Sequence, residues 1–277
     1  MSGMRFHTPI LILAAGLGAL PAAAETTLLD RGYQQMYDLQ FSQAHDTFHT
    51  FEQDHPEDPM GPVSDAAACL FSEFDRMHIL QSEFFVHEQH FFTDHKLSPD
   101  PQLKRRFDAD LEAARRLAGR APANADAQFA RLLATGLESD YMALIEKRYA
   151  ASFQQMKAGR VMAEQLLSAH PQYYDAWIAV GVENYMLSVK PAPVRWLLRL
   201  AGGETDRALG IEKLRLTASK GHYLAPFARL LLAVASLRTG DSREAKDILA
   251  GLCKEYPHNP LYAQELARLR TTTGIAR

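Results

Sequence analysis

Three segments of the chain repeat one spacing of a small residue, two apolar residues and a proline. The apolar residues follow the small residue by four and seven positions and the proline follows it by twelve, in Ala44-Phe48-Phe51-Pro56, Gly159-Ala163-Leu166-Pro171 and Ala245-Leu249-Leu252-Pro257. Offsets of four and seven place residues on one face of a helix. The small residue lets a second helix approach closely, and proline ends the helix because it lacks an N–H and clashes with the preceding turn. The spacing therefore predicts helices that pack in pairs.

The helices expected beside these segments carry small residues at matching positions. Gly32 and Ala233 each precede the alanine of the next segment by twelve positions, and Trp177, Val180 and Gly181 begin a further helix. This arrangement resembles the tetratricopeptide repeat, in which Trp-x2-Leu-Gly-x2-Tyr, Ala-x3-Phe and Pro recur over about 34 residues. The resemblance implies an all-α solenoid of antiparallel helical hairpins with a concave groove. The segments are not spaced by multiples of 34, so we expect insertions between irregular hairpins.

The rest of the chain also has helical periodicity, and no segment alternates like a convincing strand. Glycine and proline punctuate the helices, and Gly240-Asp241 is typical of a turn followed by a helix cap. We expect one repeat domain over residues 25–277. The expected helices lie near residues 27–39, 42–55, 63–80, 82–93, 101–119, 123–138, 141–169, 173–188, 193–200, 204–219, 223–238, 241–255 and 259–270.

The first 24 residues have the composition of a cleavable export signal. Arg5 precedes an apolar run over residues 9–20, and Ala22-Ala23-Ala24 provides a small-residue cleavage site. The run is shorter than the roughly 20 residues that a membrane-spanning helix needs, and no later run is longer. We therefore expect cleavage after Ala24, a periplasmic or secreted protein, and no transmembrane segment after cleavage.

Charge and cysteine content narrow the classes of function further. The formal net charge is −3 and the sequence contains no lysine- or arginine-rich block, so nothing favours nucleic-acid binding. Cys69 and Cys253 are the two cysteines. Export would permit a disulfide between them, but both lie in apolar helical patterns, where a buried free thiol is the commoner state.

Residues 78–96 carry the sharpest cluster of polar side chains. On a helix, Glu83, His87, His90 and Asp94 would share one narrow strip. Two imidazoles and two carboxylates are ligands that zinc accepts. The strip is equally the solvated face of a helix whose phenylalanines pack elsewhere, and the spacing differs from His-Glu-x-x-His. We favour the solvated face and predict no bound metal, with these four residues as the candidate ligands.

Residues 190–203 interrupt the repeat spacing with a short basic helix that carries a tryptophan. Arg195, Trp196 and Arg199 are the residue types that contact a membrane surface from an interfacial helix. Because the helix is short, packing over the end of the neighbouring hairpin is the favoured interpretation, and weak membrane-surface contact remains the alternative.

The sequence lacks the catalytic motifs that we sought, including Gly-x-Ser-x-Gly and phosphate-binding glycine loops. We therefore expect no enzyme and no cofactor. The repeat resemblance instead implies a scaffold that binds a protein or peptide in its groove, lined by the first helix of each hairpin. The candidate partner-binding residues by position are Tyr33, Met36, Tyr37, Ile178, Tyr185, Met186 and Arg238. A receptor for a small apolar ligand or a metal, and an enzyme of another type, remain the alternatives.

Overall fold

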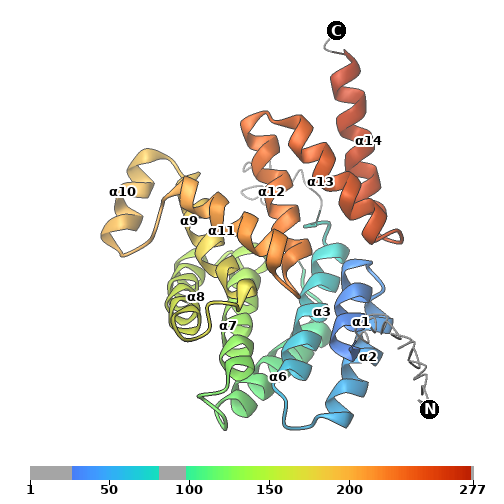
Figure 1. The fold of residues 1–277 in the computed structure, drawn as a ribbon, viewed down its shortest axis with the longest axis vertical. Coiled ribbons are helices and arrows are strands. Elements are labelled where there is room, and N and C mark those ends of the chain that lie inside the picture. Colours follow the sequence, from blue (N-terminus) through green and yellow to red (C-terminus); the bar gives the residue numbers. More distant parts are fainter. Residues whose placement is uncertain (1–26, 81–97, 276–277) are drawn as a thin grey trace, which may run out of the picture.

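The computed structural model describes residues 27–80 and 98–275, and its regular elements over these residues are all helical (Figure 1). Twelve α-helices occur in this part of the chain. They are α1 (Leu28–Tyr37), α2 (Phe41–Asp54), α3 (Met60–Arg76), α6 (Pro101–Ala118), α7 (Ala125–Asp140), α8 (Tyr149–Ala169), α9 (Trp177–Ser188), α10 (Ala192–Leu200), α11 (Arg207–Lys220), α12 (Ala225–Thr239), α13 (Ser242–Glu255) and α14 (Pro260–Ile275). The predicted all-α class is confirmed for these residues.

Helix starts follow the capping chemistry of the sequence. Thr27 and Asp30 form a reciprocal capping box at the start of α1, in which Asp30 N donates to Thr27 Oγ1 at 3.1 Å and Thr27 N donates to Asp30 Oδ2 at 3.0 Å. Asn124 accepts from Ala127 N at 3.0 Å at the start of α7. Before α13, Gly240 adopts φ +81° and Asp241 accepts from Glu244 N, which confirms the predicted turn and cap.

Most helices pack against their neighbours in sequence, as a helical-hairpin array requires. The closest pair is α9 with α11, where glycines face the opposing backbone. A Cβ on Gly181 would lie 3.0 Å from Leu214 N, and a Cβ on Gly210 would lie 2.6 Å from Tyr185 N. Glycine at these positions therefore sets the distance between the two helices, as the spacing around Gly181 predicted.

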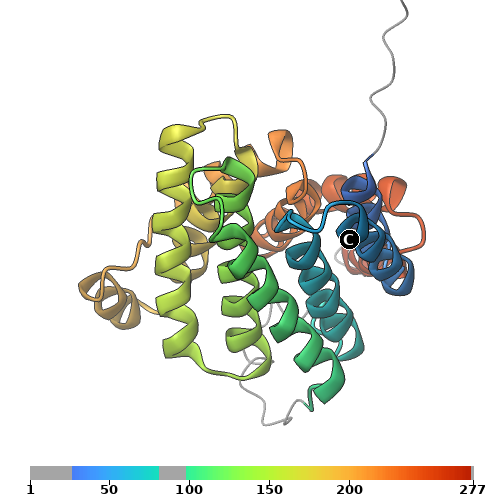
Figure 2. The same ribbon diagram turned by 90° about the horizontal axis from the view of Figure 1, so that it is seen from below.

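The first and last described hairpins contact each other. Asn259 Nδ2 donates to the carbonyl of Tyr37 at 2.8 Å, and His258 N donates to Asp38 Oδ1 at 2.8 Å. Tyr37 Oη donates to the carbonyl of Tyr223 at 3.0 Å. One apolar core accordingly extends from Leu29 in α1 to residues of α14. Helix α1 therefore lies against the loops before α12 and α14, and Figure 2 shows it beside the C-terminal helices.

Two elements differ from the expected ones. The helix expected over residues 141–169 is divided into a π-helical turn, Tyr141–Ile145, and α8, with Lys147 at φ 59° between them. Helix α10 projects from the body (Figure 1) and none of its residues is buried. The favoured interpretation of packing over the neighbouring hairpin is therefore wrong for α10.

The described residues also bear on two further predictions, the absence of a transmembrane segment and the state of the two cysteines. Among the described helices, none combines the length and the apolar character that crossing a bilayer requires. Cys69 and Cys253 both carry free thiols, one buried in α3 and one half-buried in α13. The export signal and the candidate metal ligands Glu83, His87, His90 and Asp94 lie outside the described residues, so both remain predictions.

Candidate functional site

An apolar cavity of about 100 Å³ lies among helices from the first and second halves of the described chain. Residues of α1, α3, α7, α8, α9 and α12 line it, together with Leu224 in the loop before α12. We call it the inner cavity. Four of the seven candidate partner-binding residues contribute to its wall, namely Tyr33, Met36 and Tyr37 from α1 and Ile178 from α9. The wall thus joins helices that are far apart in sequence.

Aromatic packing holds this wall in place. Tyr33 stacks on Tyr223 with ring centroids 4.7 Å apart, and Tyr37 meets Phe71 edge-on at 5.7 Å. The hydroxyl of Tyr33 accepts a hydrogen bond from Ser64 at 3.1 Å. Burial raises the pKa of both tyrosines on α1 above the ordinary value. Tyr33 and Tyr37 are therefore uncharged, satisfied wall residues of the cavity and not exposed groove residues.

The other three candidate residues lie away from the inner cavity. Tyr185 is buried between α9 and α11 against Gly210, and Met186 is half-buried on the same small cluster. Arg238 is half-buried in the last turn of α12. The structure therefore does not bring all seven residues to one surface, because α11 covers the part of α9 that carries Tyr185.

Two glycines border the inner cavity where α7 and α8 face each other. Gly136 is exposed and also lines the cavity, and a Cβ at this position would meet nothing within 4 Å. Gly159 lies on the α8 side, where a Cβ would come no closer than 3.8 Å, to Leu132. The cavity therefore opens to the surface at Gly136, and we call this opening the mouth. Gly159 is buried against α7, in keeping with the helix packing that its small size predicted.

Asp140 is the charged residue of the cavity lining, half-buried at the end of α7 and one helical turn after Gly136. The other polar lining groups are occupied, since Ser139 Oγ bonds to Ser152 and Gln155 Nε2 donates to Glu138 at 3.2 Å. Burial raises the pKa of the Asp140 carboxyl to about 7. Sequence reasoning missed this residue, because nothing in the sequence reveals which face of α7 borders a cavity.

A second hollow, of about 180 Å³, lies between α12, α13 and α14 and reaches Leu80, beside the undescribed segment 81–97. Its two charged lining residues, Glu265 and Arg268, bond to each other. Among the described residues this hollow therefore presents no uncompensated charge to a ligand, in contrast to the inner cavity.

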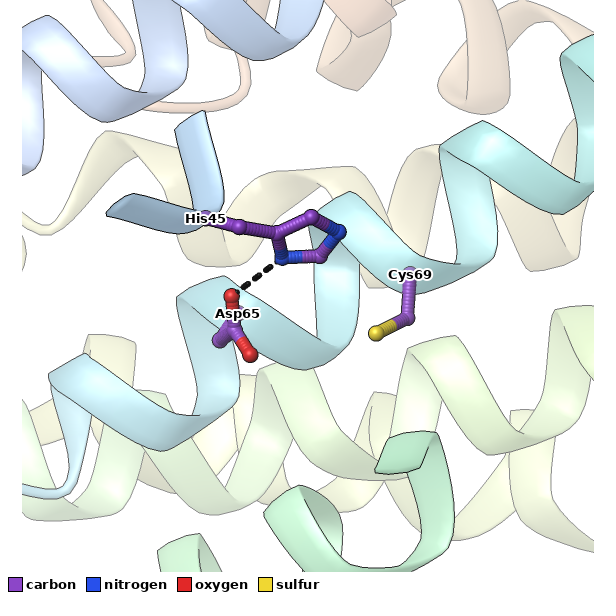
Figure 3. Close-up of side chains that lie close together, drawn as sticks. All are labelled: His45, Asp65 and Cys69. Atoms are coloured by element: carbon purple, nitrogen blue, oxygen red, sulfur yellow. Dashed lines mark hydrogen bonds and ion pairs between the residues drawn. The ribbon is translucent and has the colours of Figure 1, made fainter. Parts of the chain in front are cut away.

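A buried cluster of ionisable side chains lies between α2 and α3 (Figure 3). His45 Nδ1 lies 2.5 Å from Asp65 Oδ1, and Cys69 is one turn after Asp65 on α3. Arg106 of α6 contacts the second oxygen of Asp65, with Nε at 2.9 Å. The sequence places His45 and Asp65 on two consecutive predicted helices. It does not reveal that the two side chains face each other.

The geometry of this cluster favours an ion network over a metal site. One potential ligand atom from each of His45, Asp65 and Cys69 lies within 4.8 Å of the other two. However, His45 Nδ1 and Asp65 Oδ1 are only 2.5 Å apart. An ion with ligand bonds of about 2.0–2.3 Å does not fit between these two atoms. Burial opposes ionisation of Asp65, but the hydrogen bond from His45 and the charge of Arg106 hold its pKa below the ordinary value. Burial and the charge of Asp65 raise the pKa of the Cys69 thiol, so the thiolate that would bind metal or act as a nucleophile is disfavoured.

Helix α10 presents an apolar stripe to solvent. Trp196, Leu197 and Leu200 are 62%, 59% and 67% exposed. The two arginines lie on another side of the helix, where Arg195 donates to the carbonyl of Lys190 at 2.8 Å and Arg199 bonds to Thr205. The arginines thus attach α10 to the loops on either side of it, while the apolar stripe remains uncovered.

Comparisons with known protein families, with curated proteins and with solved structures find no match to this chain.

Proposed function

We propose that this protein is an exported, tetratricopeptide-like scaffold that binds a protein or peptide partner and has no catalytic role. The proposal draws on the signal-like composition of residues 1–24, the repeated helical spacing, and the packing of sequential helices in pairs. In such arrays the inner helices present the binding surface. Here that surface is the inner cavity and its mouth between α7 and α8.

The observation that carries the proposal is the composition of the cavity wall. Tyr33, Met36, Tyr37 and Ile178 were selected by position in the repeat, and the same four residues line one cavity. Tyrosine and methionine are well suited to apolar recognition. A cavity of about 100 Å³ accepts one side chain of a partner and not an extended segment, because an engineered cavity of about 150 Å³ holds a single benzene. The partner therefore anchors one residue there and contacts the rims of α7 and α8.

A small apolar ligand is the second candidate, and the same volume supports it. A single small organic molecule would occupy the space that the anchor side chain of a partner would otherwise fill. Native mass spectrometry of protein purified from its own cell distinguishes the two candidates, because a co-purified small mass is expected of a ligand receptor alone.

Substitution of Gly136 tests the proposal with a matched control. Gly136→Leu places a side chain in the mouth, whereas Gly251→Leu places one on the exposed surface of α13, where a Cβ also meets nothing within 4 Å. Crosslinking in the exporting cell, followed by mass spectrometry, should identify partners that are lost in Gly136→Leu and retained in Gly251→Leu. An identical set of crosslinked partners in both variants and in the wild type contradicts the assignment of the binding site.

A further inference from the structure

Asp140 lines the inner cavity without a counter-charge. The part of the chain that the structure describes provides it with neither an ion pair nor a side-chain hydrogen bond. The remaining ionisable lining residues are Tyr33 and Tyr37 of α1, whose pKa values burial raises, while α3, α8, α9 and α12 contribute no ionisable group to the lining. Any positive charge that compensates Asp140 must therefore come from outside these residues.

The backbone around Asp140 is also irregular. Helix α7 ends at this residue and continues as the π-helical turn Tyr141–Ile145. Single π-helical turns inside helices are rare and are frequent at functional sites. The turn directly follows Asp140, four residues after Gly136 at the mouth.

Asp140 is half-buried, so its carboxylate is partly desolvated by the apolar lining, and a cation that reaches it offsets that cost. A charge-assisted hydrogen bond to a carboxylate is about twice as strong as a neutral one. The polar lining groups Ser139 and Gln155 are bonded to other residues, so the lining is poorly suited to solvating a large or highly charged cation such as a hydrated metal ion. The matching ligand has an aliphatic stem for the walls and one compact, hydrogen-bonding positive group for Asp140.

We propose that the inner cavity binds a primary aliphatic ammonium group, such as the lysine side chain of a partner, with the ammonium on Asp140 and the methylene stem on the cavity wall. This inference rests on the proposed function, because it specifies which anchor the cavity accepts. It assigns specificity to Asp140 and apolar affinity to residues such as Met36 and Met156, both of which line the cavity.

The test uses n-butylammonium, which reproduces the lysine side chain, and n-butanol as its neutral counterpart. Protein labelled with ¹³C at the methionine methyls reports binding through Met36 and Met156, while Met60, which does not line the cavity, is the internal control. At pH 8, n-butylammonium should bind the wild type about tenfold more tightly than n-butanol, as expected for a charge-assisted bond. The preference should decline towards pH 5, because Asp140 becomes protonated whereas the amine, like lysine, stays charged.

Two variants separate the charge of Asp140 from the cavity itself. Asp140→Asn should abolish the preference for n-butylammonium and leave the affinity for n-butanol unchanged. Asp110→Asn is the matched control, since burial also raises the pKa of Asp110, to about 8, but this residue does not line the cavity. It should retain the preference. A capped Gly-Gly-Lys-Gly-Gly peptide, compared with its norleucine analogue, distinguishes a partner's lysine from a small free amine as the source of the ammonium group.

The possible failures are distinguishable. Equal binding of the two probes to the wild type, or a preference that persists in Asp140→Asn, overturns the ammonium inference while the cavity remains a binding site. If neither probe shifts the methyl signals of Met36 and Met156, the proposed function fails together with the inference.

Discussion

Phe48 packs directly on Gly32, so closely that a Cβ at Gly32 would lie 2.2 Å from Cε1 of Phe48. The phenyl ring therefore occupies the space that any larger residue on α1 would need. This contact joins α1 and α2, and it is the close approach that the small-residue spacing of the sequence predicted.

Gly32→Ala should therefore destabilise the protein by about 1–3 kcal/mol, the usual cost of forcing a methyl group into a packed core. Gly251→Ala is the control, because its Cβ has open space and alanine gains about 0.5–1 kcal/mol over glycine inside a helix. Urea unfolding measures both. Equal effects of the two substitutions would show that α1 and α2 are not packed as described.

Asn259 links the ends of the array. It is 4% exposed, donates to the Tyr37 carbonyl at 2.8 Å and accepts from Leu261 N at 3.0 Å. Asn259→Ala should cost about 2–3 kcal/mol, because it removes a cap and leaves a buried carbonyl without its donor. Asn124→Ala removes only a cap and should cost about 1 kcal/mol. Hydrogen exchange should also accelerate in α1 for Asn259→Ala alone, and unchanged exchange there would argue against the contact between the two ends.

Arg106 compensates Asp65, whose side chain is 1% exposed, through Nη2 at 2.7 Å. Arg106→Gln should destabilise the protein by about 1–3 kcal/mol, since Asp65 loses a charged hydrogen-bond donor in a buried position. Arg116→Gln on the same helix is the control, because Arg116 is exposed and lies 4.0 Å from Glu112. Its effect should be below about 0.5 kcal/mol. Denaturant midpoints that coincide for the two variants would refute the buried ion network.

The raised pKa of Asp140, about 7 against an ordinary value of 3.8, predicts a pH-dependent stability. The folded state holds this proton more tightly than the unfolded state, so its contribution is fully present below the ordinary pKa and is lost as pH rises through 7. Asp110 acts in the same direction. The free energy of unfolding should therefore fall less between pH 5 and pH 8 in Asp140→Asn than in the wild type. Asp46→Asn is the control, because Asp46 is exposed. A pH dependence equal to that of the wild type in Asp140→Asn would contradict the burial of its charge.

The apolar stripe of α10 should contribute little to stability. Trp196→Ser with Leu200→Ser should change the free energy of unfolding by less than about 0.5 kcal/mol per site, because both side chains are mostly exposed. If α10 contacts a membrane surface, the double variant should sediment less with vesicles that contain anionic lipid, while Val161→Ser, at another exposed apolar residue of the body, should not. Loss of stability comparable to a core substitution would show that α10 is covered in solution.

Local chemistry made most helices predictable from the sequence. The signals for these helices are each encoded within a few residues. They are the apolar spacing, the caps at Thr27, Asn124 and Asp241, and the helix ends at proline and Gly240. The break at Lys147 was not predictable, because the sequence there contains neither glycine nor proline and lysine rarely adopts the left-handed conformation. Helix α10 is exposed because no other element covers its apolar side in the described part of the chain. The apolar spacing of a helix cannot show whether another element covers it.

The candidate site was predictable only in part, for a geometric reason. Tyr33, Met36 and Tyr37 line one cavity with Ile178, whereas the candidates Tyr185, Met186 and Arg238 do not. Which faces of the helices border the cavity depends on contacts between segments that are far apart in the sequence, such as the hydrogen bond from Asn259 to the Tyr37 carbonyl. No local pattern of α7 marks Asp140 and Gly136 as cavity-lining residues.

The folded protein keeps an apolar cavity between α7, α8 and α1. A crystal pressurised with xenon tests for this cavity, because xenon occupies apolar cavities of about 150 Å³ and is located by its anomalous scattering. We predict a xenon site bounded by Tyr37, Leu133 and Met156, which disappears in Gly136→Leu and persists in Gly251→Leu. Side chains that fill this space, with no xenon there in the wild type, would show that the cavity is absent.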